Sequence, residues 1–255
     1  MFAIIICILA GIGAGLGTGF AGLSAAVVIS PMLIAFLDVP AYQATGIALA
    51  SDVLASAISA YTFHKNKNLD IKGALPLLTT VLIFTLVGSF IATFIPNSTL
   101  GGLSELMTAF LGLKFIIRPI TRTGNRNENE SRRVSLIKAI GSGVYIGTVC
   151  GFMGAGGGMM LLFALTIVMG YELKCAIGTS VFIMTFTAFT GAASHIYLGG
   201  MPNLTYLLVC ICSTVVFARI AAVIANRVKP VTLNRITGIL LVVVSLAVLI
   251  SDYIL

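Results

Sequence analysis

The sequence contains no tryptophan and very few charged residues. Asp, Glu, Lys and Arg make up only 9% of its 255 residues, whereas 58% are hydrophobic, and the mean hydropathy is +1.10. Soluble domains carry about 25% charged residues, so this composition excludes an ordinary soluble domain. It indicates a polytopic protein that lies in the lipid bilayer, with only Tyr and Phe available for aromatic belts at the two interfaces.

Motifs of catalysis and of metal binding are also missing. The five cysteines form no CxxC pair, the two histidines have no cysteine at metal-ligand spacing, and no HExxH, GxGD or nucleophile-elbow motif occurs. We therefore expect no enzymatic activity, no metal and no cofactor. The cysteines are expected to be small buried residues, although Cys150 lies inside a glycine-rich stretch.

Negative charge is scarce as well, and the net charge is +7. Such an excess occurs in nucleic-acid-binding proteins, but membrane proteins concentrate Lys and Arg in their cytoplasmic loops. We interpret the charge in this second way and expect no nucleic-acid partner.

The first apolar run has no basic segment before it and no cleavage pattern, so it is expected to be a retained membrane segment rather than a signal peptide.

Apolar segments are numerous, and two of them are unusually long. A transmembrane helix needs about 20 apolar residues. The first and fifth segments are too long for one straight span, and the polar stretch between the fourth and fifth, 121–135, is predicted to be a cytoplasmic linker. The segments lie at 2–37, 42–63, 73–95, 100–120, 136–169, 174–197, 203–225 and 233–254.

Glycine interrupts both long segments at corresponding places. The second contains Gly147-Thr-Val-Cys-Gly-Phe-Met-Gly-Ala-Gly-Gly-Gly158, and a shift of the numbering by 132 lays Gly15 on Gly147 and Gly22 on Gly154. Each glycine weakens a helix by about 1 kcal/mol relative to alanine, so each long segment is predicted to be two half-helices that meet at a break. Broken backbone inside a membrane is tolerated only where protein covers it or where it lines a cavity. The breaks are therefore candidate sites.

The distribution of basic residues decides how the long segments run. If each crossed the membrane once, ten Lys and Arg residues would face one side and five the other; if each turns back as a hairpin, all fifteen face one side. The positive-inside rule favours the hairpin. Both termini are then predicted to lie outside, and the loops around Lys65, Arg126 and Arg227 in the cytoplasm. A hairpin adds no net crossing, so the second half is predicted to be inverted relative to the first.

The predicted fold is an all-α polytopic membrane protein with two inverted-topology repeats. Residues 1–120 form the first repeat, 121–135 the linker and 136–255 the second repeat, each repeat being a broken hairpin followed by three transmembrane helices. Inverted repeats that meet at broken helices are typical of secondary transporters. Because the two hairpins enter from opposite faces, their tips are predicted to meet near the middle of the membrane.

The hairpin tips are the first candidates for a substrate site. The N-terminus of a half-helix presents unpaired backbone N–H groups and a partial positive charge, which suits an anion. The alternative is that the glycines only let helices pack closely. The candidates are Gly22, Leu23 and Ser24 in the first tip and Ala155, Gly156, Gly157 and Gly158 in the second.

Hydroxyl groups follow each hairpin in a similar pattern. The next segments begin with Ala44-Thr-Gly-Ile-Ala48 and Ala176-Ile-Gly-Thr-Ser180. A glycine beside hydroxyls permits a kink and offers donors to an oxyanion, so Thr45, Thr179 and Ser180 are candidate substrate-binding residues. Hydroxyls in membrane helices also commonly bond to their own backbone or to a neighbouring helix, which is the structural alternative for each of them.

Asp52 stands midway along the segment 42–63. Ionisable groups inside a membrane are costly and are functional candidates. Asp52 is a candidate for proton coupling or for pairing with a buried cation such as Arg219. Arg219 lies toward the cytoplasmic end of its own segment, where it is expected to act first as a snorkelling anchor and second as an anion gate.

The break Gly154-Ala-Gly-Gly-Gly158, followed about twenty residues later by Ala176-Ile-Gly-Thr-Ser180, resembles the TauE/SafE sulfite exporter family. The resemblance extends over essentially the whole chain through the segment count, the polar linker and the repeat. It implies transport of a small anion, with sulfite, sulfoacetate or another organosulfonate as the cargo. The first copy departs from the pattern, with Ser24-Ala-Ala26 in place of Gly156-Gly-Gly158 and Ile47-Ala48 in place of Thr179-Ser180.

The predicted function is export of a sulfur-containing anion across the cytoplasmic membrane by alternating access between the two halves. With the cell interior negative, the outward movement of one negative elementary charge is favourable by about 2.3 kcal/mol per 100 mV. A sulfite dianion gains about twice this, so passive efflux suffices. Two alternatives stay open: a permease for another small anionic metabolite, and a membrane component that binds an anion without transporting it.

Overall fold

A computed structural model describes residues 1–92, 110, 113–117, 119, 132–153, 157–199 and 201–254. All regular secondary structure in this part of the chain is helical, so the predicted all-α class is confirmed. Most of the predicted segment 100–120 and most of the predicted linker lie outside the described residues, as do the candidates Ala155 and Gly156.

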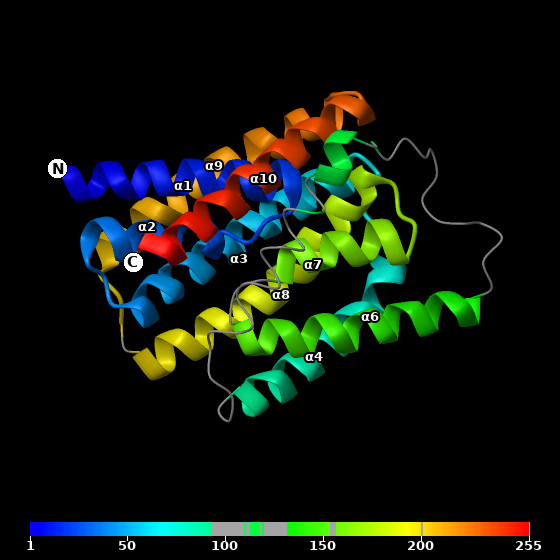
Figure 1. Ribbon diagram of the computed structural model, residues 1–255, viewed down its shortest axis with the longest axis horizontal. Helices are drawn as coiled ribbons and strands as arrows, with labels where there is room; N and C mark the ends of the chain where they lie inside the picture. The colour runs from blue at the N-terminus through cyan, green and yellow to red at the C-terminus, as the bar shows by residue number, and fades with distance from the viewer. Residues whose placement is uncertain are drawn as a thin grey trace.

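The first long segment is a helical hairpin. Its first helix, α1 (Phe2–Ala21), ends at Gly22, which has φ of 64° and so takes a left-handed conformation that glycine adopts without strain. The N–H groups of Gly22 and Leu23 bond to carbonyls in the last turns of α1 at 3.0 and 3.2 Å, a common helix ending. The second helix, α2 (Ala26–Leu37), runs back along α1 (Figure 1). The break predicted here is therefore confirmed.

The second long segment contains two described helices, and residues 154–156 between them lie outside the described part of the chain. Its first helix, α6 (Arg132–Met153), ends close to the predicted break, and the described chain resumes with α7 (Gly157–Phe163). A short π-helix, η1 (Ala164–Val168), continues α7. The glycine pattern predicts two half-helices but gives no indication of the π-helical turn, a feature that often marks functional positions.

The other described helices agree closely with the predicted segments. Their first residues differ by no more than three positions from the predicted starts. They are α3 (Ala41–Lys65), α4 (Ile71–Ala92), α8 (Leu173–Gly199), α9 (Leu204–Arg227) and α10 (Pro230–Ile254).

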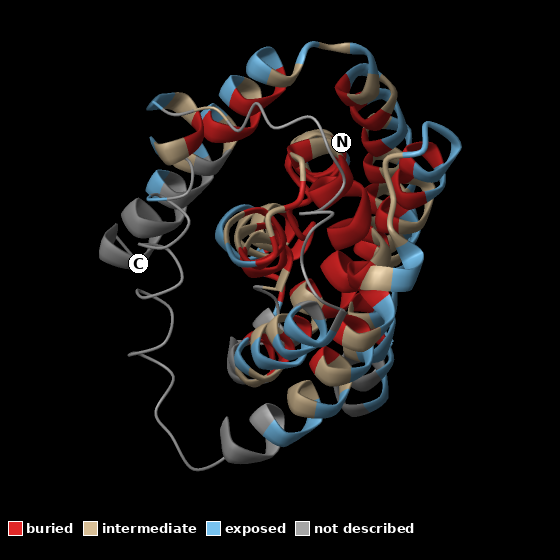
Figure 2. Cartoon of the chain, turned by 90° about the vertical axis from the view of Figure 1, so that its right-hand side faces the viewer, coloured by how far each residue is buried: buried red, intermediate tan, exposed pale blue. Residues whose placement is uncertain are grey.

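Helices α3 and α8 form an antiparallel pair at the centre of the molecule. Gly178, near the start of α8, packs against Phe63 near the end of α3, whereas Gly191 packs against Leu49. The spans of α3 and α8 are 67% and 61% buried, compared with 28% for α9. Figure 2 shows the buried residues gathered between the helices. The first helices after the two hairpins therefore run in opposite directions.

Glycine residues on one side of α1 and of α6 let each hairpin approach a helix of the opposite half closely. A methyl group added to Gly15 or Gly19 of α1 would lie 2.5 Å from a carbonyl oxygen of α9. A methyl group on Gly147 of α6 would lie 2.6 Å from the carbonyl oxygen of Val81 in α4. Since Gly15 and Gly147 are related by the shift of 132, the two packing arrangements correspond.

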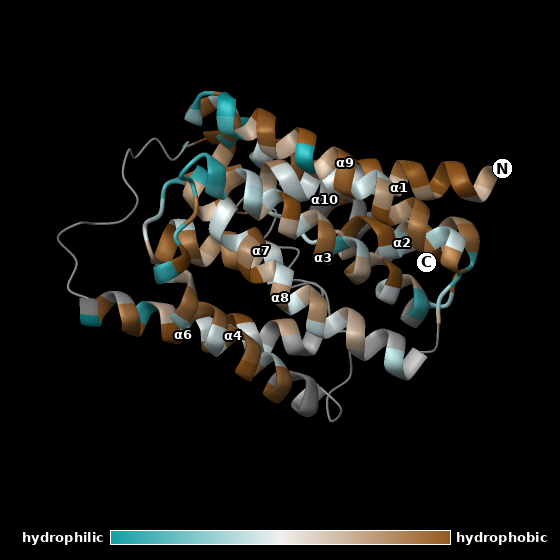
Figure 3. Ribbon diagram, turned by 180° about the vertical axis from the view of Figure 1, so that it is seen from behind, coloured by the Kyte–Doolittle hydropathy of each residue, from teal (hydrophilic) through white to brown (hydrophobic). Residues whose placement is uncertain are grey.

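The outer surface of the helices is apolar, and part of the interior is polar. Leu86, Phe189 and Val243 are 72%, 63% and 57% exposed, whereas Ser51 and Asp52 are buried. Figure 3 shows hydrophilic residues gathered at the end where α3 connects to α4 and α9 to α10. This arrangement is that of a multi-pass membrane protein. The described helices long and apolar enough to cross a membrane lie at Phe2–Ala21, Gln43–Lys65, Leu173–Ala193 and Leu204–Arg227.

Replacing Gly19 with alanine is expected to lower the thermal stability of the purified protein, because the new methyl group meets the α9 backbone. Overpacking of this kind costs about 1–3 kcal/mol. Gly141→Ala is the matched control: it lies in α6 with nothing within 4 Å of the added methyl group, and alanine favours a helix by about 1 kcal/mol. Melting curves in detergent compare the two variants. Equal melting temperatures would contradict the close packing of α1 on α9.

Candidate functional site

The break that ends α1 meets the start of α7. A methyl group added to Gly158, in the second tip, would overlap the carbonyl oxygen of Gly22 and lie 3.0 Å from the backbone nitrogen of Ser24. A methyl group added to Gly22 would lie 2.5 Å from the hydroxyl of Ser180 on α8. The predicted meeting of the tips is therefore observed, and it includes four of the candidate residues: Gly22, Ser24, Gly158 and Ser180.

The Ser24 side chain binds the carboxylate of Asp52. Its hydroxyl donates to Asp52 Oδ2 at 2.6 Å, and the Ser56 hydroxyl donates to Oδ1 at 3.0 Å. The backbone N–H of Ala25 is a third donor to this carboxylate. Asp52 is only 1% exposed. The N-terminus of α2 thus already holds an anionic group, and that group belongs to the protein.

Arg219 is not the partner of Asp52. Its side chain is exposed on α9, whereas Asp52 is buried on α3. The interpretation that Asp52 pairs with a buried Arg219 is therefore wrong. The arginine stem can lie along the apolar surface of α9 and carry its charge toward the interface, as long basic side chains do.

The two tips differ in the residue that faces them. The shift of 132 lays Asp52 on Met184, and the Met184 sulfur lies 2.7 Å from the position of a methyl group on Gly158. A neutral thioether therefore stands beside the second tip where a carboxylate stands beside the first. The positive end of the first half-helix is compensated by Asp52, and the second has no such carboxylate among the described residues.

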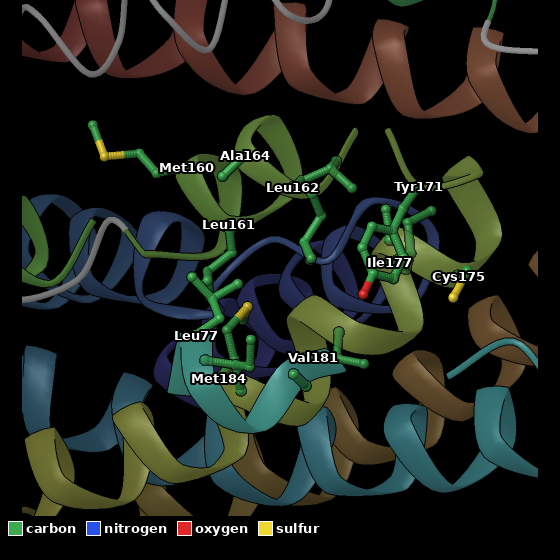
Figure 4. Packing of buried hydrophobic residues seen from close by; sticks show 14 of the residues in the cluster. Leu77, Met160, Leu161, Leu162, Ala164, Tyr171, Cys175, Ile177, Val181 and Met184 are labelled. Atoms are coloured by element: carbon green, nitrogen blue, oxygen red, sulfur yellow. The ribbon is translucent and has the colours of Figure 1, made fainter. Parts of the chain in front are cut away.

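Apolar packing holds the second half-helix in place. Leu161, Leu162 and Ala164 are fully or almost fully buried. Figure 4 shows Leu161 pointing toward Leu77 of α4 and Met184 of α8. The second tip is therefore fixed by close contacts with helices from both halves of the chain.

Thr179 lies in a hydrogen-bond network at the polar end of the molecule rather than at the tips. Its hydroxyl accepts from the backbone N–H of Asp70 at 3.3 Å, and the Tyr171 hydroxyl donates to Asp70 Oδ2 at 2.8 Å. Asn68 donates to the side chain of Asn226 at 2.6 Å. The backbone oxygen of Asn226 accepts from the Lys174 ammonium group at 2.9 Å. These two sets of hydrogen bonds are joined through the chain from Asn68 to Asp70, and together we call them the polar latch; its members are Asn68, Asp70, Tyr171, Lys174, Thr179 and Asn226.

The remaining candidates lie in different surroundings. Thr45 is half-buried near the start of α3, whereas Thr179 lies beside Gly178, which packs on Phe63 near the other end of α3. Eighteen residues of helix separate Thr45 from Phe63, about 27 Å, so one small anion cannot touch both threonines. Leu23 is buried, and its carbonyl accepts from the Thr18 hydroxyl at 2.8 Å.

Three contacts of the site were not predicted from the sequence. They are the hydrogen bond from Ser24 to Asp52, the bond from Tyr171 to Asp70, and the position of Met184 beside Gly158. Each joins residues that are far apart in the chain. The one available signal was the shift of 132, which relates Asp52 to Met184.

Comparisons with known proteins agree with this architecture. A family model described as "Sulfite exporter TauE/SafE" matches residues 7–248. The chain is 24% identical over 260 residues to the "Probable membrane transporter protein YunE" of Bacillus subtilis (strain 168), covering 94% of this chain and 95% of that protein. It is 22% identical over 220 residues to the "Probable membrane transporter protein YdhB" of the same organism, covering 86% and 89%.

The contact between the tips predicts unequal effects for two adjacent glycines. Gly158→Ala is expected to lower the melting temperature, because the methyl group meets backbone atoms of the first tip, at a cost of about 1–3 kcal/mol. Gly157→Ala is the control, because its methyl group meets the sulfur of Cys150 at 2.8 Å, and a thiol can rotate away. If Gly157→Ala proves the more damaging of the two, the tips do not meet at Gly158.

Proposed function

The chain belongs to the TauE/SafE family of membrane transporters, and from this premise we propose that it exports a small sulfur-containing anion, sulfite or an organosulfonate such as sulfoacetate, by alternating access. The observation that carries the proposal is the contact between the break at Gly22 and Gly158 at the start of α7. Breaks inside a membrane are tolerated where protein covers them or where they line a cavity. Discontinuous helices at a repeat interface are the usual position of a transporter's substrate.

We propose that the two halves are inverted repeats. Two features support this: the antiparallel α3 and α8 pair, and the corresponding contacts of Gly15 and Gly147, which place each hairpin against a helix of the other half. On this reading the first repeat ends near residue 120 and the second begins near 136. Movement of one hairpin with its attached helices would open the tips to alternate sides.

The anion is proposed to bind between the tips. Backbone N–H groups of residues 155–158 and the Ser180 hydroxyl would donate to its oxygens, since donors at the start of a half-helix suit an anion. Ser180 is well placed because its side chain already lies against Gly22. The Ser180 hydroxyl donates to the Ile177 carbonyl at 2.9 Å, so it would have to rotate away from its own helix to meet the anion. Thr179 is left out of this site because its hydroxyl accepts from the Asp70 backbone N–H. Thr45 is left out because it lies seven residues, about 10 Å along α3, from Asp52, which binds the first tip.

We propose that the polar latch lies on the cytoplasmic side and that both chain termini lie outside. The latch stands at the end where Lys65, Lys67, Lys174, Arg227 and Lys229 occur, and cytoplasmic loops are rich in such residues. The latch joins the α3–α4 connection to the start of α8 and the end of α9. On this proposal it acts as the gate on the cytoplasmic side of the cytoplasmic membrane.

Transport is tested by efflux from proteoliposomes under an imposed membrane potential, with sulfite, sulfoacetate, taurine, sulfate and acetate compared. Potential-driven efflux of a sulfur oxyanion is expected. Ser180→Ala is expected to lower the transport efficiency about tenfold or more, because a hydrogen bond to a charged group contributes about 1.5–3 kcal/mol. Thr190→Ala, on the exposed face of the same helix, is the control and should leave efflux unchanged.

The other outcomes of this assay separate the alternatives. Efflux of acetate alone would indicate a permease for a different anionic metabolite. Absence of flux for every anion, with the protein folded and inserted, would favour a component that binds without transporting. Loss of flux in both Ser180→Ala and Thr190→Ala would contradict a role for the Ser180 hydroxyl in binding the anion, because the control lies on the exposed face of the helix.

The gate is tested by the accessibility of Cys175, which is fully buried and whose sulfur lies 3.9 Å from the Thr179 hydroxyl. In a protein that retains only this cysteine, Tyr171→Phe is expected to raise the rate of maleimide labelling about tenfold. The variant loses a hydrogen bond to a charged group, at about 1.5–3 kcal/mol. Tyr61→Phe, at a residue that is 64% exposed, is the control. Equal rates in the two variants would contradict a gating role for the latch.

A further inference from the structure

We propose that the outer face of α9 binds an anionic phospholipid, with Arg219 and Arg227 holding the headgroup phosphate and the apolar residues of the same face lying along the acyl chains. The inference concerns a surface that contacts lipid. It therefore does not depend on which anion the protein transports or on the direction of transport.

Helix α9 is the described membrane span that protein covers least. It is only 28% buried, whereas the other described spans are at least 50% buried. Apart from Thr205 in the first turn, its exposed residues recur mostly at intervals of three or four positions, which places them on one side of the helix. This outer face of α9 comprises Leu204, Leu208, Cys212, Val216, Arg219, Ile220, Ile224 and Arg227.

Arg219 lies on the outer face but well inside the span. It precedes Arg227, the last residue of α9, by eight positions, about 12 Å along the helix axis. Exposed apolar side chains flank it, since Val216 is 53% and Ile220 is 45% exposed. A positive charge among lipid-facing side chains is costly unless a polar or anionic group accompanies it.

The helices that pack on α9 supply no anion for Arg219. The sequence contains no Asp or Glu between residues 173 and 251, a stretch that includes all of α9. Helix α9 packs mainly on α1 and α3. Helix α1 has no charged residue, and the one acidic residue of α3, Asp52, is buried and accepts from Ser24. A lipid headgroup is the anion that lies beside an outward-facing side chain.

Arg227 provides a second contact for the same headgroup. It is exposed on the outer face, and its Cα–Cβ bond tilts toward the N-terminus of the helix and so toward Arg219. Arg219 can extend its long stem toward the polar end, as basic side chains in membranes do. The two guanidinium groups then approach one phosphate from opposite sides. Guanidinium groups suit this task, because their paired N–H donors match phosphate oxygens.

Positive charge continues beyond the end of α9. Lys229 lies in the connection to α10 and Arg235 in the second turn of α10, and both are exposed. With the two arginines of α9 they make a group of four basic residues. Groups of about four to eight such residues beside a membrane helix are typical of binding sites for anionic lipids.

The distribution of residues on the outer face fits an amphiphile rather than a soluble anion. The basic residues lie toward one end, and from Val216 back to Leu204 the face carries no charge and is mostly apolar. A phosphate held beside Arg219 would place the acyl chains along this apolar part. Inorganic phosphate, nucleic acids and phosphopeptides enter hydrocarbon only at a large cost, so they do not reach a side chain inside the span.

The lipid site is tested by melting curves of the purified protein in neutral detergent at constant ionic strength. Phosphatidylglycerol is expected to raise the melting temperature, and phosphatidylcholine with the same acyl chains is not. In the double variant Arg219→Gln, Arg227→Gln the phosphatidylglycerol concentration for half of the shift should rise about fivefold for each arginine removed, the factor that one basic residue contributes near an anionic surface.

The double variant Lys65→Gln, Lys72→Gln is the matched control. It removes the same charge from exposed residues of α3 and α4 and should respond to phosphatidylglycerol as the wild type does. An equal loss of response in both double variants would overturn the site, because general charge attraction would then explain the effect. Arg219→Lys keeps the charge without the paired donors and should bind with intermediate affinity.

Three other results would overturn the proposal. The first is a wild-type protein that melts alike in phosphatidylglycerol and in phosphatidylcholine. The second is an equal rise of the melting temperature with inorganic phosphate, which would identify a soluble anion as the occupant. The third is a change of oligomeric state in the arginine variants, measured by light scattering, without any wild-type response to phosphatidylglycerol. That result would show that a second copy of the chain covers the outer face of α9.

Discussion

The structure depends on protein covering the interrupted backbone at Gly22, because the hydrocarbon core of a membrane contains no water to bond to it. Gly22 ends α1 in a left-handed conformation, and the chain then needs several residues before α2 begins. In hydrocarbon every free N–H or C=O in such a stretch is costly. The break therefore persists because the second tip, the hydroxyl of Ser180 and the carboxylate of Asp52 surround it. Asp52 accepts from the Ala25 N–H, whereas the second tip and Ser180 cover the break by close contact, and these surroundings also form the candidate site.

Close approach of helices is the second condition of the fold. The apolar medium provides no hydrophobic force between helices, so association relies on tight packing and on hydrogen bonds. Gly15, Gly19 and Gly147 provide the packing at the hairpins, and the polar latch provides hydrogen bonds at one end. Glycines in this chain thus have two separate uses: some permit a break, and others permit contact between intact helices.

Much of the fold could be predicted because its signals are local. Segment length and hydropathy define the helices, and the glycine clusters define the break at Gly22. The pairing of Ser24 with Asp52 could not be predicted, because 28 residues separate them, and that of Tyr171 with Asp70 spans 101 residues. Composition gives no measure of which distant residues touch. For the same reason the sequence suggested Arg219 as a partner for Asp52, although helix rotation places its side chain on the outer face of α9.

The packing of α1 on α9 also constrains how the protein is made. Gly11 of α1 lies against Ser213 of α9, so about two hundred residues must be synthesised between the two contact faces. Chains are made from the N-terminus, and α1 therefore enters the bilayer long before its partner exists. Its glycine face must remain covered by lipid or by other protein during that interval. Final consolidation of the first hairpin is consequently a late event in biogenesis, which follows insertion of the second half.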